Sequence, residues 1–147
     1  SPIGSRHAAA VRRLRRLFTP LEMEGACLIA VQDPVRLNPF SEPQPDLALL
    51  RPRPDLYQEG HPGPQDVLLL VEVAEASLAY DLGVKAPLYA RHGVLELWVL
   101  DLDGKRLHVL RSPSPEGYRE AQTLAPGNHL APVAFPSFSL PVAELLG

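Results

Sequence analysis

The chain has 147 residues, 46% of them hydrophobic, and a formal net charge of −3 at pH 7. These values are typical of one globular domain with one core, and they exclude a disordered chain and a strongly basic nucleic-acid-binding surface over the whole domain. No apolar run approaches the roughly 20 residues of a membrane-crossing helix, and we expect no signal peptide. The single cysteine excludes an internal disulfide framework and fits a cytoplasmic protein.

The first half of the chain predicts one helix followed by short strands. Residues 5–18 repeat apolar side chains at helical spacing, which indicates an amphipathic helix. Pieces that favour β-structure follow at residues 27–31, 35–37 and 47–50, and a proline- and glycine-rich loop covers residues 52–64. With 17 prolines in the whole chain, a helical bundle or a coiled coil is excluded.

The middle of the chain predicts a buried strand and then a helix. Residues 66–73 (DVLLLVEV) form an almost continuous apolar run, which is typical of a central strand buried on both faces. Ser77 can cap a helix that runs to about residue 92, and Gly93 follows where a left-handed C-cap residue belongs. Pro87 lies inside this span, so it either kinks the helix or shortens its regular part.

The last third of the chain predicts further strands. Residues 95–100 and 106–110 read as two strands joined through Asp103-Gly104, a strong hairpin signal. Residues 118–124 indicate an edge strand, and we expect the tail at 135–146 to pack against the sheet. Helix, strands, helix and strands in this order predict a mixed α/β domain with a central sheet.

Two carboxylates are the most informative residues. Glu72 interrupts the predicted central strand, where a charge is expensive to desolvate. It can mark a strand end that reaches solvent, a salt bridge to an arginine, or a functional site. Asp46 opens the preceding strand directly after a proline, and it can cap that turn or share an edge of the sheet with Glu72.

If these strands are neighbours, the two carboxylates come close together. At about 4 Å and an effective dielectric near 20, two like charges repel by about 4 kcal/mol. Such a pair takes up a proton or binds a divalent cation, and carboxylate oxygens suit Mg²⁺ or Mn²⁺.

Lys85 is the third candidate, and it is one of only two lysines in the chain. It lies one helical turn after Asp81, so it can form a surface ion pair with that residue. Alternatively, the helix directs its ammonium group to the carboxylate edge, where it stabilises the charge of a phosphate.

The stretch from Glu72 to Asp101 (EVAEASLAYDLGVKAPLYARHGVLELWVLD), preceded by Pro45-Asp46, resembles the Uma-type putative restriction endonucleases of the PD-(D/E)xK nuclease superfamily. The specific matches are Tyr80-Asp81, Lys85, Pro87-Leu88-Tyr89-Ala90, Gly93-Val94, Glu96 and Trp98-Val99. Ser1-Pro2 and His7 also resemble the segment that opens the family's first core helix. The resemblance implies one restriction-endonuclease-like domain over residues 1–147, an α/β fold with a mixed central sheet flanked by helices, without the family's N-terminal hairpin.

The resemblance also implies a catalytic metal site. Asp46 matches the aspartate of the PD element and Glu72 the acidic residue of the (D/E)xK element. The superfamily's lysine position is Ala74 here, and Lys85 on the following helix matches the lysine of this family. Mg²⁺ (or Mn²⁺) is then held by Asp46, Glu72 and the backbone carbonyl of Val73.

The function implied is a Mg²⁺-dependent endonuclease that hydrolyses DNA phosphodiester bonds. A homodimer is expected, because cutting both strands of a duplex requires two such sites. A non-catalytic nucleic-acid-binding or assembly module with the nuclease fold remains the alternative, favoured by the acidic net charge and by Ala74. A nuclease that acts on RNA or on single strands is a third possibility.

Several other residues are assigned structural roles. The arginines within residues 12–16 are expected on a solvated helix face, although they are able to contact a phosphate backbone. His7 is a candidate substrate contact, and the histidines lack the spacing of a metal site. Trp98 and Tyr89 are expected to pack under the helix, and Glu96 is expected to be exposed on a strand or to contact a second copy.

Overall fold

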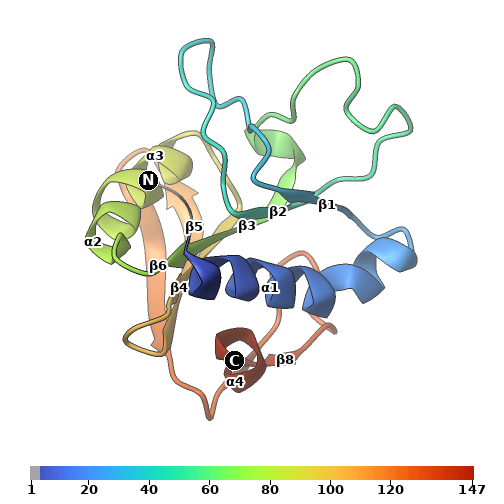
Figure 1. The fold of residues 1–147 in the computed structure, drawn as a ribbon. Helices are drawn as coiled ribbons and strands as arrows, with labels where there is room; N and C mark the ends of the chain where they lie inside the picture. Colours follow the sequence, from blue (N-terminus) through green and yellow to red (C-terminus); the bar gives the residue numbers. More distant parts are fainter. Residues whose placement is uncertain (1–3) are drawn as a thin grey trace.

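The computed structural model describes residues 4–147, so Ser1-Pro2 lie outside the described residues. A six-stranded sheet lies between two layers of helix (Figure 1), as the mixed α/β prediction requires. Its strands are β1 (Leu28–Val31), β2 (Leu47–Leu50), β3 (Val67–Ala74), β4 (Glu96–Asp101), β5 (Arg106–Ser114) and β6 (Gly117–Leu124). The helical elements are α1 (Ser5–Met23), the 3-10 turn η1 (Pro64–Asp66), α2 (Leu78–Tyr80), the π-helical turn η2 (Asp81–Lys85), α3 (Ala86–Arg91) and α4 (Val142–Leu146). A second, two-stranded sheet pairs β7 (His129–Leu130) with β8 (Leu140–Pro141).

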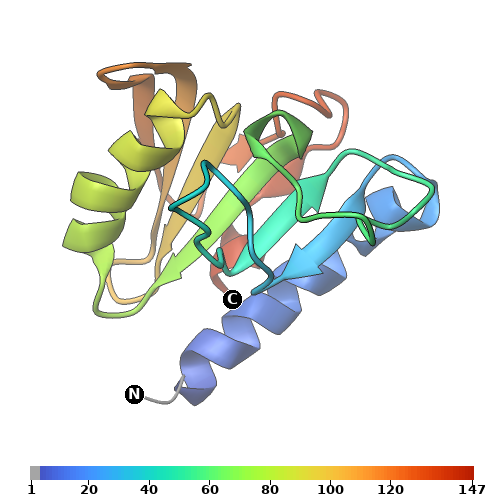
Figure 2. The ribbon, with the colours of Figure 1, turned by 90° about the horizontal axis from the view of Figure 1, so that it is seen from above.

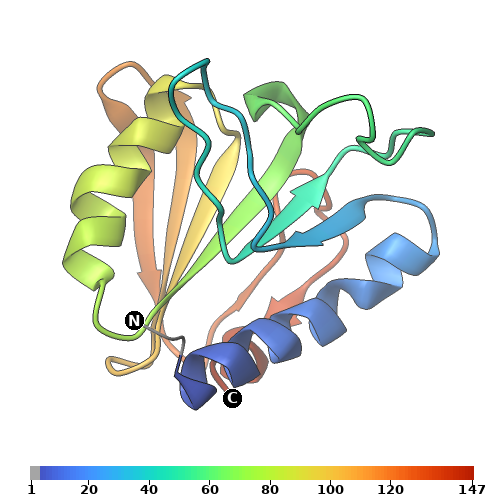
Figure 3. The same cartoon turned by 45° about the horizontal axis from the view of Figure 1, so that its top comes forward.

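The strands of the main sheet follow one another in chain order, from β1 to β6. β3 and β4 are parallel, and the other neighbouring pairs are antiparallel. Two parallel strands need a crossover connection, and here the α2–η2–α3 segment provides it. Figure 3 shows that this segment and α1 lie on opposite sides of the sheet.

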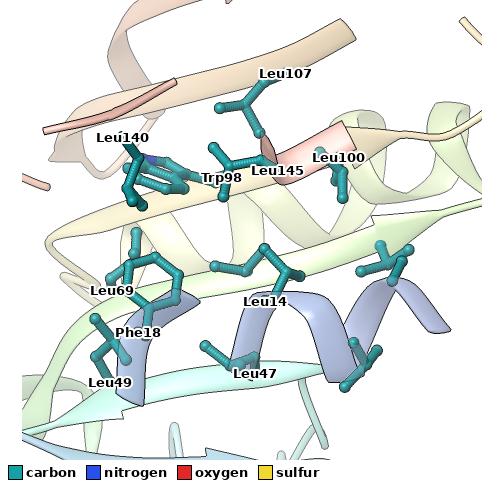
Figure 4. Close-up of a cluster of buried hydrophobic side chains, with 14 of the residues drawn as sticks. Leu14, Phe18, Leu47, Leu49, Leu69, Trp98, Leu100, Leu107, Leu140 and Leu145 are labelled. Atoms are coloured by element: carbon teal, nitrogen blue, oxygen red, sulfur yellow. The ribbon is translucent and has the colours of Figure 1, made fainter. Parts of the chain in front are cut away.

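Side chains alternate between the two faces of the sheet along each strand, so the core consists of two clusters, one on each face. The odd-numbered positions of β3 from Leu69 to Val73 face α1 and α4, together with Trp98 and Phe18, whose rings lie 5.9 Å apart (Figure 4). The even-numbered positions, such as Leu70, face α3. All eight residues of β3 are buried, so the prediction of a strand covered on both faces is confirmed.

The α1 helix is longer than predicted. Its apolar stripe continues through buried Leu21, and the helix therefore extends past residue 18 to Met23, with Pro20 in its last turn. Packing of that last turn against the core outweighs the missing proline N–H.

Residues 35–37 are not a strand of the sheet, so that prediction was wrong. Val35 and Leu37 instead bond through their backbone N–H groups to the carbonyls of Pro43 and Ser41, in the returning part of the same loop. Both side chains are buried, and they cover the α3 side of the core. Figure 2 shows this loop and the following long loop over the sheet, seen from above. The apolar pattern indicated burial correctly, but not the pairing partner.

The predicted helix over residues 77–92 is interrupted by a π-helical turn. The N–H of Ala86 bonds to the carbonyl of Asp81, five residues earlier, directly before Pro87. The wide turn accommodates a residue that has no N–H to donate. Gly93 ends the helix at φ +81°, as predicted, and the Val94 N–H bonds back to Tyr89 O.

Glu96 is fully buried rather than exposed, so the prediction for this residue was wrong. Its carboxylate accepts hydrogen bonds from Trp98 Nε1 at 2.8 Å, Arg111 Nε at 2.7 Å and the Val133 N–H at 2.8 Å. It therefore connects β4, β5 and the C-terminal tail. Sequence pattern misses this because the segment that covers Glu96 lies 37 residues further along the chain.

The predicted hairpin, edge strand and packed tail are present as β4–β5, β6 and the α4 region. Across residues 4–147, no helix combines the length and apolarity needed to cross a membrane.

Replacing Glu96 by alanine leaves the Arg111 guanidinium, the Trp98 indole N–H and the Val133 N–H without an acceptor. Removing one partner of a buried, hydrogen-bonded charge is strongly destabilising, so we expect the free energy of unfolding to fall by about 3 kcal/mol in urea titrations. Glu116→Ala, at an exposed position, serves as the control and should change it by less than about 0.5 kcal/mol. Equal effects of the two changes would contradict the structural role of Glu96.

Candidate active site

β3 continues past the first residue of β2, so its last residues have no strand partner on the β2 side. We call this part of the sheet the open end of β3. Leu47 of β2 lies opposite Val71 of β3, so the next residue before β2, Asp46, comes opposite Glu72. From there β3 remains paired with β4 on one side only. The Val73 N–H, left without a strand partner on the β2 side, donates to Asp46 Oδ2 at 2.7 Å. Because the N–H and C=O of one strand residue face the same neighbour, the Val73 carbonyl is directed to this side too.

Asp46 is held in place by its backbone as well as by its side chain. Pro45 before it is buried, and the carbonyls of Pro45 and Asp46 both accept from the Gln32 N–H, at 3.1 and 3.2 Å. The Asp46 N–H donates to Glu72 Oε1 at 3.1 Å. The two carboxylates predicted to share an edge are therefore linked in both directions, each accepting a hydrogen bond from the other strand.

Glu72 lies on the α3 face of the central strand, and only 2% of its side chain is exposed. Its two oxygens have different partners. Oε1 accepts from the Asp46 N–H, whereas Oε2 accepts from Lys85 Nζ at 3.0 Å and from the Tyr89 hydroxyl at 2.9 Å. The buried carboxylate is thus fully hydrogen-bonded, which a charge in a core requires.

The crossover segment supplies the other half of the site. Asp81, Lys85 and Tyr89 follow one another at intervals of four residues, so all three lie on one face of the segment. Lys85 Nζ is also 3.5 Å from Asp81 Oδ1, and the Ser77 hydroxyl donates to Asp81 Oδ2 at 2.8 Å. The ammonium group lies between two carboxylates, and the π-helical turn begins and ends at two of these residues.

Burial and charge shift the protonation equilibria of this group. Burial raises the pKa of Glu72 above its usual value, and the nearby Lys85 ammonium only partly offsets this effect. Burial lowers the pKa of Lys85, but the charge of Glu72 and its hydrogen bond outweigh that effect and raise it overall, so the ammonium stays charged at neutral pH. Burial and the same carboxylate raise the pKa of Tyr89 far beyond the physiological range, which keeps its hydroxyl a donor.

His7, from the first turn of α1, lies against the other side of Asp46. Its Nε2 is 3.2 Å from Asp46 Oδ2, and its buried Nδ1 has no hydrogen-bond partner among residues 4–147. Beside it, Arg6 pairs with Glu75 at 3.4 Å and with Asp103 at 3.0 Å. The N-terminal helix therefore borders the site, and its predicted substrate contact through His7 remains a prediction.

The structure brings Asp46, Glu72, Val73 and Lys85 together, as the sequence predicts. The arginines of residues 12–16 are not part of this group: Arg13 bonds to the carbonyls of Leu145 and Leu146, and the other three are exposed. Sequence reasoning placed Tyr89 only in the core and missed its hydroxyl. Its spacing of four residues from Lys85 was the available signal.

Within residues 4–147, no three His, Cys, Asp or Glu side chains come together as a metal-binding cluster. The donor set at the open end of β3 is smaller, namely two carboxylates and a backbone carbonyl. Mg²⁺ is commonly bound through one or two carboxylates and keeps several waters, so these hard oxygen donors fit it or Mn²⁺.

Comparisons with known proteins show the family and the fold that this chain resembles. A family model described as "Uma2: Putative restriction endonuclease" matches residues 1–143. A crystal structure described as a putative nuclease belonging to DUF820, from Anabaena variabilis ATCC 29413, is similar in fold with a TM-score of 0.72. Its sequence is 17% identical, and the match covers 99% of this chain and 82% of that chain. A search of curated proteins gave no match.

Replacing Lys85 by alanine removes the ammonium partner of a buried carboxylate. The pKa of Glu72 should rise further, and the ionised form then costs more, so we expect the free energy of unfolding at pH 8 to fall by about 1–2 kcal/mol. Protonation of Glu72 removes the cost of burying its negative charge, and the pKa of Glu72 in the folded protein already lies above that of an unfolded glutamate. The difference from wild type should therefore shrink as the pH falls to 5.

Urea unfolding at several pH values measures this difference. Lys105→Ala is the matched control, because Lys105 is the only other lysine and is exposed. Its effect should be small and the same at every pH. A Lys85→Ala effect that is independent of pH would contradict the coupling to Glu72.

Proposed function

Because the chain belongs to the Uma2 family of putative restriction endonucleases, we propose that it is a divalent-metal-dependent endonuclease that hydrolyses DNA phosphodiester bonds. The observation that carries the proposal is the meeting of Asp46, Glu72 and Lys85 at the open end of β3. A buried glutamate with a raised pKa, next to a second carboxylate and a charged lysine, is an arrangement concentrated at functional sites.

The carboxylates of Asp46 and Glu72 and the carbonyl of Val73 are the groups that would hold the cation. When bound, a divalent cation neutralises phosphate charge and lowers the pKa of a coordinated water. The hydrogen bonds from the Val73 and Asp46 N–H groups fix both carboxylates before any ligand arrives. Such preorganisation is what electrostatic catalysis requires.

Lys85 is the residue that would contact the substrate phosphate. Its side chain is about one-third exposed, whereas Glu72 is buried, so the ammonium group can reach a phosphate from the solvent side. There it would stabilise the negative charge that develops as water adds to phosphorus and the bond to the leaving sugar oxygen breaks. The water supplies the hydroxyl of the phosphate product, and its proton balances the one taken up by the leaving oxygen.

Duplex DNA is the substrate we propose, cleaved by a homodimer, since one site hydrolyses one strand at a time. The product of a plasmid reaction shows whether the active protein is a dimer or a monomer. A dimer that acts on both strands gives linear DNA, whereas a monomer gives nicked circles first.

Supercoiled plasmid with Mg²⁺ or Mn²⁺ provides the direct test of the activity. We expect nicking or linearisation that EDTA abolishes, with a rate reduced about 100-fold or more in Glu72→Gln and in Lys85→Ala. The first change removes a carboxylate that would hold the cation, and the second removes the ammonium group that would act on the reacting phosphate. Lys105→Ala is again the control and should retain the wild-type rate.

A wild-type protein that binds DNA but never cleaves it would favour the alternative, a non-catalytic nucleic-acid-binding module. Cleavage that survives both Glu72→Gln and Lys85→Ala would place the activity at another site or in a contaminant.

A further inference from the structure

Two hydrogen-bond donors share one oxygen of Glu72. Lys85 Nζ and the Tyr89 hydroxyl both donate to Oε2, at 3.0 and 2.9 Å, whereas Oε1 receives only the Asp46 N–H. A carboxylate oxygen has two lone pairs, so Oε2 can hold both donors at once and keeps a hydrogen bond if one of them leaves.

The two donors differ in mobility. Tyr89 is fully buried and packs with Ala86, Leu70 and Val99 in the core cluster beneath α3. A rigid ring with such neighbours keeps its hydroxyl at one place. Lys85 carries its ammonium on a four-carbon stem that is about one-third exposed.

Lys85 also has a second carboxylate within reach. Asp81 Oδ1 is 3.5 Å from Nζ, and Ser77 holds the other oxygen of Asp81. The ammonium group can therefore leave Glu72 while remaining beside a negative charge. If it turns toward a phosphate, the only described donor that stays on Oε2 is the Tyr89 hydroxyl.

We propose that Tyr89 is a positioning residue that holds Glu72 Oε2 in place, so that Lys85 is free to move from Glu72 to the substrate phosphate. This inference rests on the proposed nuclease function and deepens it. In this arrangement the two oxygens of Glu72 have different roles. Oε2 accepts hydrogen bonds from Tyr89 and Lys85, and Oε1, which faces Asp46, is the oxygen that would bind the cation.

Tyr89→Phe tests the proposal, because it removes the hydroxyl and keeps the ring in the core. Tyr118→Phe is the matched control: its hydroxyl also donates one hydrogen bond, to Val94 O at 2.8 Å, away from the site. Melting temperatures of the two variants show how much each lost hydrogen bond contributes to stability alone. Steady-state cleavage and titration with Mn²⁺ then measure function.

We expect Tyr89→Phe to lower kcat about 10-fold or more and to weaken Mn²⁺ binding by a similar factor, since groups that orient a metal ligand typically contribute that much. The KM for DNA should change less than about twofold, because Tyr89 does not reach the substrate. Tyr118→Phe should leave kcat and Mn²⁺ affinity at wild-type values.

A second measurement uses the Lys85→Ala background, in which Tyr89 is the last donor to Oε2 among the residues that the structure describes. There Tyr89→Phe should weaken Mn²⁺ binding more than it does in the wild type, because no donor then remains. Equal losses in the two backgrounds would contradict the shared-oxygen account.

The outcomes separate this inference from the proposed function. Wild-type cleavage and Mn²⁺ binding, with Tyr89→Phe indistinguishable from Tyr118→Phe, would overturn the role of Tyr89 and leave the nuclease proposal standing. A wild-type protein that neither cleaves nor binds Mn²⁺ would overturn both.

Discussion

The structure is organised around one carboxylate, Glu72, in a strand that is buried along its whole length. An ionised group in that position loses its hydration and is tolerated only where hydrogen bonds and opposite charge replace the lost water. The groups that do so come from three separate parts of the chain: the Asp46 N–H from the start of β2, and Lys85 and Tyr89 from the crossover segment. Burial nevertheless raises the pKa of Glu72, so these partners offset only part of the cost of removing the carboxylate from water, as is often found at functional sites.

Topology explains why these parts meet. β3 and β4 are parallel, and the connection between them has to cross one face of the sheet. That crossover places Lys85 and Tyr89 over the even-numbered face of β3, to which Glu72 belongs. On the other side of β3 lies β2, whose first residue pairs with Val71. Asp46, the residue before β2, therefore comes opposite Glu72, and its carboxylate accepts the hydrogen bond of the Val73 N–H. The site follows from a strand that is longer than one of its neighbours and from a helix that returns over it.

Sequence reasoning predicted the features that depend on local pattern. The apolar run of β3, the Asp103-Gly104 hairpin and the C-cap at Gly93 are set by residues a few positions apart, and each is present. The three side chains proposed for the site, Asp46, Glu72 and Lys85, were also singled out as candidates from their sequence context and from the family resemblance, and the structure brings them together. Features that depend on distant segments were missed. Residues 35–37 pair within their own loop, Glu96 is covered by the tail, and the Tyr89 hydroxyl is a donor only because Glu72 faces it across the sheet–helix interface.

The proposed function depends on divalent-cation binding by the oxygens at the open end of β3, and a crystal structure with Mn²⁺ tests this binding most directly. Anomalous scattering from the manganese should give one peak within about 2.0–2.4 Å of carboxylate oxygens of both Asp46 and Glu72. The same peak should be lost from crystals of Glu72→Gln grown and soaked in the same way. A saturating soak that leaves this position without a peak, or a peak bound only by other residues, would contradict the account.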